Sequence, residues 1–313
     1  MNGLWLDFER PIIELETKIA ELEKLPGVED EIERLRAQAD RLRKKIYSNL
    51  TRWQRVQLAR HPRRPYATDL MKFIFSDFIE LHGDRRFSDD PAIIAGLAQL
   101  EAHSLILIAQ QKGRDTKEKI RRNFGSPHPE GYRKALRLIR FAGKFNLPVV
   151  TFVDTPGAYP GKGAEERGQA MAIAENLLEF AAVRVPVIVM IIGEGGSGGA
   201  LAIALGDRVL MLENAVYSVI TPEGCASILW RDSSRNKEAA EVLKTTAQDL
   251  KRFNIIDEIV PEPVGGAHFD YETTAHNIKK ALTRNLNELK KLAPDDLVRQ
   301  RIDKYRQMGV YKT

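Results

Sequence analysis

The chain has 313 residues and a net charge of +5, with 48 lysine and arginine residues against 43 aspartate and glutamate residues. This excess is small for the length and does not indicate a nucleic-acid partner. Hydrophobic residues make up 43% and charged residues 29%, which is typical of a protein that buries one substantial core. The single cysteine, Cys225, excludes an internal disulfide framework and a thiolate zinc site built by this chain alone.

Two further features bear on where the protein works. The longest apolar run, 185–192, contains Pro186 and is far shorter than the roughly 18 residues that suggest a membrane span. Residues 1–9 carry acidic side chains and no cationic leader, so we expect neither a secretory signal nor a transit peptide. These patterns predict a cytoplasmic protein without a membrane partner.

Two amphipathic helices are predicted near the N-terminus. Apolar residues from Ile12 to Leu22 form one stripe, Pro26 and Gly27 interrupt it, and a second stripe steps by four and three residues up to Ile46. Such heptad spacing predicts an antiparallel helical hairpin that serves as scaffold or subunit contact. We assign residues 1–65 to this hairpin and its linker.

Residues 66–270 alternate short apolar segments with loops and helices, a pattern typical of a layered α/β domain. The predicted strands are 105–109, 149–153, 187–192, 209–212 and 217–220. A predicted helix over 165–183 separates the second strand from the third, so these strands should be parallel and the loops at their carboxyl ends should lie side by side.

Residues 271–313 are predicted to form a C-terminal helical extension. An apolar stripe from Ile278 to Leu292 indicates a long amphipathic helix that stops near Pro294, and a second, polar helix follows. We expect this extension to pack or to associate.

The segment 193–199 reads Gly-Glu-Gly-Gly-Ser-Gly-Gly and directly follows the predicted strand 187–192. Where side chains are absent, backbone N–H groups at the start of a helix can approach a ligand closely, and the helix dipole favours negative charge there. The segment therefore predicts an anion or oxyanion site.

Other interpretations of this segment remain open. Gly193, Gly195 and Gly198 fit the G-x-G-x-x-G dinucleotide fingerprint, with Glu213 near the position of a ribose-binding acid, but only about two helical turns fit before Gly206.

Ser197, between Gly195 and Gly199, fits the frame of a hydrolase nucleophile, although the sequence indicates no histidine or aspartate as its partner. Glycines needed only for tight backbone packing are a further possibility.

A second glycine-rich loop, 154–163, follows the preceding predicted strand, and the two loops together predict a pocket. Motifs in and around them match one known family. The matching stretches are 154–161, 163–168, 193–201 and 222–230, with 59–66 and 261–268 beyond them. They resemble the alpha subunits of bacterial acetyl-coenzyme A carboxylase carboxyltransferase over nearly the whole chain.

The resemblance implies a crotonase-like fold, a ClpP/crotonase spiral of ββα units, with the helical hairpin and C-terminal helices attached. It implies a transferase that moves the carboxyl group of carboxybiotin, held on a separate biotin carboxyl carrier protein, to acetyl-coenzyme A. The product, malonyl-coenzyme A, begins fatty acid synthesis. The implied partners are a beta subunit with a zinc ribbon, in an α2β2 assembly, and biotin carboxylase in the larger complex.

In the implied reaction one oxyanion forms on the thioester enolate and another on the ureido oxygen of biotin. The resemblance assigns the biotin side to this chain. Gly198 and Gly199 are expected to donate their N–H groups to that oxygen, with Gly195 and Gly196 as pocket residues and as the alternative donor pair.

The other loop, with Gly157, Ala158 and Tyr159, is expected to form the opposite wall of the carboxybiotin pocket. Tyr159 either packs on biotin or is structural. Glu165 and Glu166 fit helix-capping charges better than a general base.

A basic segment follows the first predicted core strand. Its cations are Lys112, Arg114, Lys117, Lys119, Arg121 and Arg122. They could contact coenzyme A phosphates, an acidic face of the partner, or only solvent. The six histidines show no metal-ligand spacing, so we expect no metal in this chain.

Two rival functions differ from the carboxyltransferase in what they need. A free-standing crotonase-type enoyl-coenzyme A hydratase or isomerase would act without a partner subunit. A non-catalytic binding protein would use the basic segment and the hairpin, and its affinity for nucleic acid would fall steeply with salt.

Overall fold

The computed structural model describes residues 5–309. Residues 1–4, part of the segment from which we predicted the location, lie outside this range. Among the described residues, no helix combines the length and the apolar character needed to cross a membrane.

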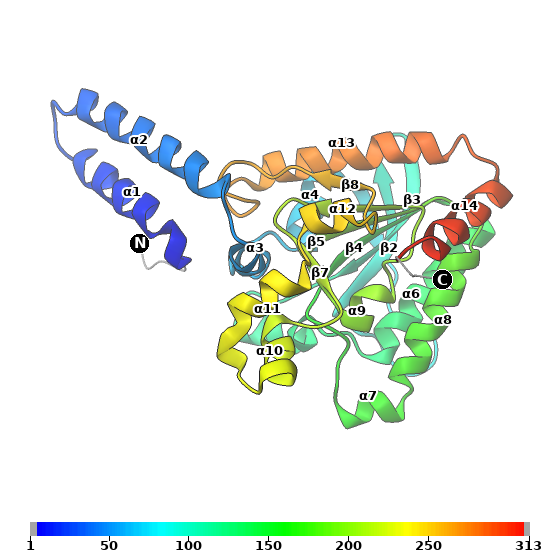
Figure 1. Ribbon diagram of the computed structural model, residues 1–313. Coiled ribbons are helices and arrows are strands. Elements are labelled where there is room, and N and C mark those ends of the chain that lie inside the picture. The colour runs from blue at the N-terminus through cyan, green and yellow to red at the C-terminus, as the bar shows by residue number, and fades with distance from the viewer. Residues whose placement is uncertain (1–4, 310–313) are drawn as a thin grey trace.

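The predicted pair of N-terminal helices is confirmed as α1 (Arg10–Leu22) and α2 (Glu29–Tyr47), preceded by the 3-10 turn η1 (Asp7–Glu9). Ile19 packs against Leu35 and Ala39 in a small cluster of their own. This cluster is separate from the main core, and the hairpin extends away from the sheet (Figure 1).

One mixed sheet organises the rest of the chain. Its strands are β1 (Ser76–Glu80), β2 (Ile93–Leu100), β3 (His103–Gln110), β4 (Val149–Thr155), β5 (Val187–Gly196), β6 (Arg208–Leu212) and β8 (Glu258–Val260), in that order, with β7 (Val216–Ser218) paired to the end of β5. The pairs from β3 to β8 are parallel, whereas β1, β2 and β3 are antiparallel.

All five predicted strands are present, and β1, β2 and β8 were missed. In β2, Gly96 allows the backbone of β1 to pass so closely that a Cβ atom at residue 96 would lie 2.0 Å from the carbonyl oxygen of Ile79. This is a contact between distant segments, which local periodicity does not report. The strand β8 has only three residues.

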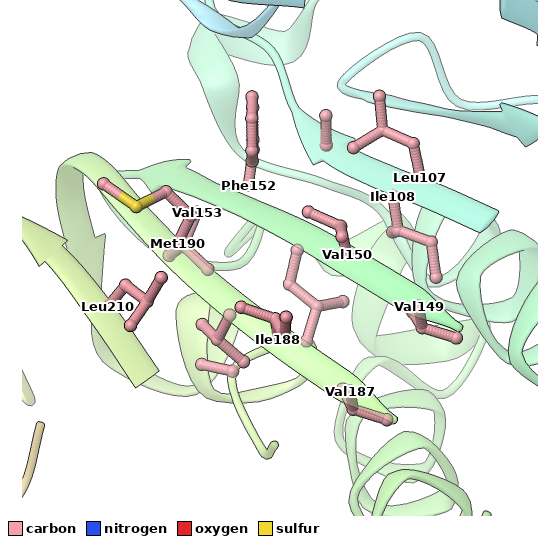
Figure 2. Packing of buried hydrophobic residues seen from close by; sticks show 14 of the residues in the cluster. Leu107, Ile108, Val149, Val150, Phe152, Val153, Val187, Ile188, Met190 and Leu210 are labelled. Atoms are coloured by element: carbon pink, nitrogen blue, oxygen red, sulfur yellow. The ribbon is translucent and has the colours of Figure 1, made fainter. Parts of the chain in front are cut away.

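The central strands are buried on both faces, as expected for parallel strands covered by helices. Every residue of β4 is buried. Side chains from four neighbouring strands pack together in Figure 2, including Ile108 from β3, Val150 from β4, Ile188 from β5 and Leu210 from β6.

Helices cover both faces of the sheet (Figure 1). On one face α6 (Pro129–Phe145) packs against α8 (Gln169–Ala182), and on the other α4 (Ala67–Ile74) packs against α13 (Tyr271–Leu289). The predicted single helix over 165–183 is wrong in one respect. Gly168, with φ of +81°, separates α7 (Lys162–Glu166) from α8.

The remaining helices are short and lie around the sheet edges. They are α3 (Arg52–Ala59), α5 (Thr116–Arg121), η2 (Asn123–Gly125), α9 (Ser197–Leu201), α10 (Pro222–Trp230), η3 (Ser233–Arg235), α11 (Asn236–Leu243) and α12 (Ala247–Arg252).

The predicted C-terminal pair of helices is confirmed, with Pro294 opening α14 (Pro294–Arg306). This second helix was predicted to be polar, yet it carries a fully buried cation. The guanidinium of Arg301 binds Asp207 and donates to the backbone carbonyls of residues 180, 183 and 185. The arginine therefore fastens α14 to the C-terminal end of α8 and to the segment that leads into β5.

Candidate functional site

The two glycine-rich loops meet at the carboxyl ends of β4 and β5, as the parallel pairing predicted. The pairing runs from Val149 opposite Val187 to Thr155 opposite Gly195. Beyond the last pair the backbones of the two loops are in close contact. A Cβ atom at residue 196 would lie only 2.2 Å from the carbonyl oxygen of Pro156.

At the end of β5 the chain turns into α9 through Ser197, whose φ is +53°. The first N–H groups of a helix have no acceptor within the helix, and no side chain caps α9. Donors are therefore present at the start of α9, beside the other loop, where the sequence predicted an oxyanion site.

Close packing requires glycine at some positions of the 193–199 segment but not at Gly198. An added Cβ atom would lie 2.6 Å from the Tyr217 ring at Gly195 and 2.3 Å from the backbone nitrogen of Ala158 at Gly199. At Gly198 it would meet only the Ile173 side chain, at 3.7 Å. Packing therefore accounts for Gly195 and Gly199 and does not account for Gly198.

This difference predicts opposite effects of two neighbouring substitutions on folding. We expect Gly199→Ala to lower the free energy of unfolding by about 1–3 kcal/mol, because its Cβ meets backbone that cannot move aside cheaply. Gly198→Ala is the matched control, and it should fold at least as stably as the unaltered chain. Urea unfolding of the isolated chain measures both, and equal stabilities would contradict this description of the packing.

A small cleft, open to solvent, adjoins the first glycine pair. It is bordered by Pro156, Gly195, Gly196 and Ser197, and its other wall comes from α3, β7 and the turn before α10. Gly198 and Gly199 do not line it. The structure thus places Gly195 and Gly196 at a cavity, and Gly198 just past its rim at the start of α9.

The wall residues predicted on the 154–163 loop lie beside α9. A Cβ atom added at Gly157 would meet nothing within 4 Å, although the Gly157 backbone packs against Gly199. The Tyr159 ring stacks on His128 with 4.1 Å between ring centroids. One face of Tyr159 is therefore covered by the chain itself. Glu165 and Glu166 are exposed, and neither caps a helix through its side chain, because Glu165 lies in the first turn of α7 and Glu166 is its last residue.

Beneath the loops lies a buried cluster of charges that the sequence did not predict. The Lys112 ammonium lies 2.7 Å from Asp154 Oδ1 and 2.7 Å from Glu194 Oε2. Arg60 donates to the other oxygen of Glu194 at 2.6 Å and to Glu223 at 2.7 Å. We call Arg60, Lys112, Asp154 and Glu194 the ion cluster.

The ion cluster shifts the pKa values of Glu194 and Lys112. Burial raises the pKa of Glu194, but the charges of Lys112 and Arg60 outweigh it and hold the pKa at about 2. Burial lowers the pKa of Lys112, and the two carboxylates overcome this effect and raise it above its usual value. At neutral pH Glu194 and Lys112 are therefore both charged. The sequence did hold a signal for it, since Asp154 and Glu194 lie within two residues after the predicted strands 149–153 and 187–192.

The interpretation of the basic segment needs a correction for Lys112, which cannot reach a phosphate on the surface because it is buried in the ion cluster. Two others already have partners. Arg114 pairs with Asp69, and Arg122 donates to the carbonyl of Pro91. Lys117, Lys119 and Arg121 are exposed on α5.

The structure also gathers Glu9, His61 and His268, a group that sequence spacing did not reveal. The two imidazoles stack with 3.9 Å between ring centroids, and Glu9 Oε1 lies 3.3 Å from His268 Nε2. An imidazole nitrogen binds a metal in its own ring plane, so two stacked rings suit a shared carboxylate better than one shared metal. We interpret the group as the contact that holds the N-terminal hairpin to the body.

With this geometry described, comparison with known proteins identifies the family. Residues 5–309 match the family model described as acetyl co-enzyme A carboxylase carboxyltransferase-like. The chain belongs to the acetyl-coenzyme A carboxylase carboxyltransferase alpha-subunit family. A member from Geobacter metallireducens is 59% identical over 308 residues, which cover 97% of each chain. One from Thermus thermophilus is 57% identical over 311 residues, 98% of each chain.

Solved structures with low sequence identity share the fold of this alpha-subunit family member. Transcarboxylase 12S matches with a TM-score of 0.59 and 19% identity, over 71% of this chain and 41% of that one. A Pseudomonas malonate decarboxylase hetero-tetramer in complex with coenzyme A matches with a TM-score of 0.58 and 16% identity, over 69% of this chain and 86% of that one. The predicted crotonase-like fold is confirmed.

Proposed function

We propose that this chain is the alpha subunit of an acetyl-coenzyme A carboxyltransferase. It would take the carboxyl group from carboxybiotin on a separate carrier protein and pass it to acetyl-coenzyme A. The product, malonyl-coenzyme A, enters fatty acid synthesis. The observation that carries the proposal is Gly198, which lies at the uncapped start of α9. Packing explains its neighbours Gly195, Gly196 and Gly199 but not Gly198.

The proposed role of Gly198 and Gly199 is to donate N–H groups to the ureido oxygen of biotin. In the transfer, the bond between the biotin nitrogen and the carboxyl carbon breaks and a carbon–carbon bond forms at the methyl carbon of the thioester. The methyl proton passes to the biotin nitrogen. Donors fixed before the reaction stabilise the oxyanion without reorganising, and this kind of stabilisation is often the largest single contribution to catalysis.

The 154–163 loop supplies the facing wall. Pro156 and Pro160 stiffen it, so little conformational entropy is lost when a ligand binds. Gly157 and Ala158 bring its backbone against Gly199. In this arrangement Tyr159 supports the wall through His128 rather than offering both ring faces to a ligand.

We further propose that a beta subunit with a zinc ribbon completes the site in an α2β2 assembly in the cytoplasm, with the biotin carboxyl carrier protein and biotin carboxylase as further partners. Exposed apolar side chains near the cleft support a partner on this side. Val219 is 77% exposed, Ile228 73% and Leu229 59%. Apolar surface of this kind is typical of a protein interface.

An assay of the isolated chain with an enoyl-coenzyme A thioester distinguishes the proposed carboxyltransferase from a free-standing enoyl-coenzyme A hydratase. We expect no hydration, because the site lacks the thioester-binding half that a partner would bring. Hydration by the isolated, folded chain at an enzymatic rate would overturn the proposal and favour a free-standing crotonase.

A further inference from the structure

Three neighbouring strands each deliver a member of the ion cluster at their carboxyl ends. Lys112 lies two residues beyond β3, Asp154 lies in β4, and Glu194 lies in β5. Their side chains converge beneath the two glycine-rich loops, and the Lys112 side chain is 13% exposed. The ammonium is thus the one group of the three that can hold the two carboxylates together.

The cluster is joined directly to the backbone that carries the donors. Asp154 Oδ1, besides binding Lys112, accepts the backbone N–H of Glu194 at 2.9 Å. A Cβ atom at Gly193 would lie 2.4 Å from the same oxygen, so β5 presses closely on this carboxylate. The glycines from 195 to 199 follow directly in the chain, so we expect a displacement of Asp154 or Glu194 to displace them as well.

The position of Lys112 is itself fixed from two sides. A Cβ atom at Gly125 would lie 2.6 Å from Lys112 Cγ, which shows that the lysine stem lies against the η2 turn. The carbonyl of Gly125 accepts the Thr155 hydroxyl at 2.7 Å, at the start of the 154–163 loop. On the same strand end, the Gln110 amide donates to the carbonyl of Gly199 at 2.8 Å.

We infer that Lys112 is a positioning residue for carboxyl transfer, because its ammonium binds Asp154 and Glu194 together and thereby sets the spacing between the 154–163 loop and the N–H groups of α9. This inference rests on the proposed function. The lysine does not touch substrate in this role and acts through the two carboxylates.

The positive charge of Lys112 also supports its role at the site. With Lys112 and Arg60 present, the two cations balance the two carboxylates of the cluster. Without Lys112, one negative charge remains beneath a site proposed to stabilise an oxyanion, and like charges repel strongly away from water. Two other titratable groups face the cluster: Tyr66, beside Lys112 and Asp154, and Glu223, which Arg60 binds. The Arg114–Asp69 pair lies beside Tyr66.

The test uses Lys112→Met in this chain, mixed with unaltered beta subunit, in the transfer of a carboxyl group from malonyl-coenzyme A to a free biotin derivative. We expect kcat to fall about tenfold to a hundredfold, as displacements near 1 Å do, while KM for malonyl-coenzyme A stays unchanged. Lys72→Met removes an equal charge from the exposed face of α4 and should leave kcat unaltered.

The pH profile separates this role from a merely structural one. The pKa of Glu194 is held at about 2 by Lys112 and Arg60. Loss of the ammonium raises it, so in Lys112→Met activity should begin to fall at a higher pH on the acid side. Lys112→Arg keeps a charge in a different place, and we expect it to fold and still lose kcat.

Two outcomes would overturn the positioning role. One is a folded Lys112→Met with unaltered kcat and pH profile. The other is full activity in Lys112→Arg, which would show that the position of the positive charge does not matter. If the unaltered mixture transfers no carboxyl group, the proposed function itself fails. Should Lys112→Met not fold, Lys112→Arg and its kcat decide the question.

Discussion

Replacing Arg301 by leucine is expected to lower the free energy of unfolding by about 3–5 kcal/mol, the cost of breaking a buried ion pair by removing one partner. The guanidinium is fully buried and binds both oxygens of Asp207, at 2.9 and 2.7 Å. Leucine would leave that carboxylate charged in the core without its cation. Backbone carbonyls of Phe180, Val183 and Val185 would lose their donors as well.

Urea unfolding of the isolated chain measures this effect, with two comparisons. Arg299→Leu alters an arginine on the same helix that is 70% exposed, and its pair with Asp296 should contribute about 1 kcal/mol or less. Arg301→Leu combined with Asp207→Asn removes the stranded charge, so the double variant should lose less than the sum of the singles. Equal losses for residues 299 and 301 would show that the buried arginine does not fasten α14.

The largest expected effect on activity comes from Gly198→Val. We expect kcat of the mixed subunits to fall by at least about 10²- to 10³-fold, the cost of losing one oxyanion donor. The branched side chain would stand where the ureido ring is proposed to bind. Folding should survive, because only Ile173 lies near the position of the new Cβ atom.

Gly198→Ala provides a graded comparison, and it should lose less activity than Gly198→Val while keeping the KM for malonyl-coenzyme A. The isolated chains should unfold at similar urea concentrations, which excludes a folding defect as the cause. Turnover at the unaltered rate in a folded Gly198→Val chain would remove Gly198 from the site and leave Gly195 and Gly196, at the cleft, as the donor pair.

Sequence periodicity predicted the elements with a clear apolar pattern of their own. The strands β4 and β5 begin with largely apolar runs, Val-Val-Thr-Phe-Val and Val-Ile-Val-Met-Ile-Ile, so they are recognisable without knowledge of their neighbours. The strand β2 was missed because its Gly96 suits a contact with β1, from another part of the chain. The break at Gly168 was missed because one left-handed residue does not disturb the apolar pattern around it.

The candidate site was predictable in its loops and not in its charges. Two glycine-rich segments after adjacent parallel strands must meet, and they do. Whether a lysine in a basic segment is exposed depends on tertiary packing, so Lys112 and the exposed Lys117 looked alike in sequence. Arg301 was hidden in the same way, since a polar helix pattern does not predict a buried cation.

The most direct test of the account is carboxyl transfer from malonyl-coenzyme A to a biotin derivative, measured with this chain alone, with the beta subunit alone and with the two mixed. We expect activity in the mixture only, because each chain is proposed to bring one half of the site. An inert mixture, with enoyl-coenzyme A hydration by this chain alone, would contradict it.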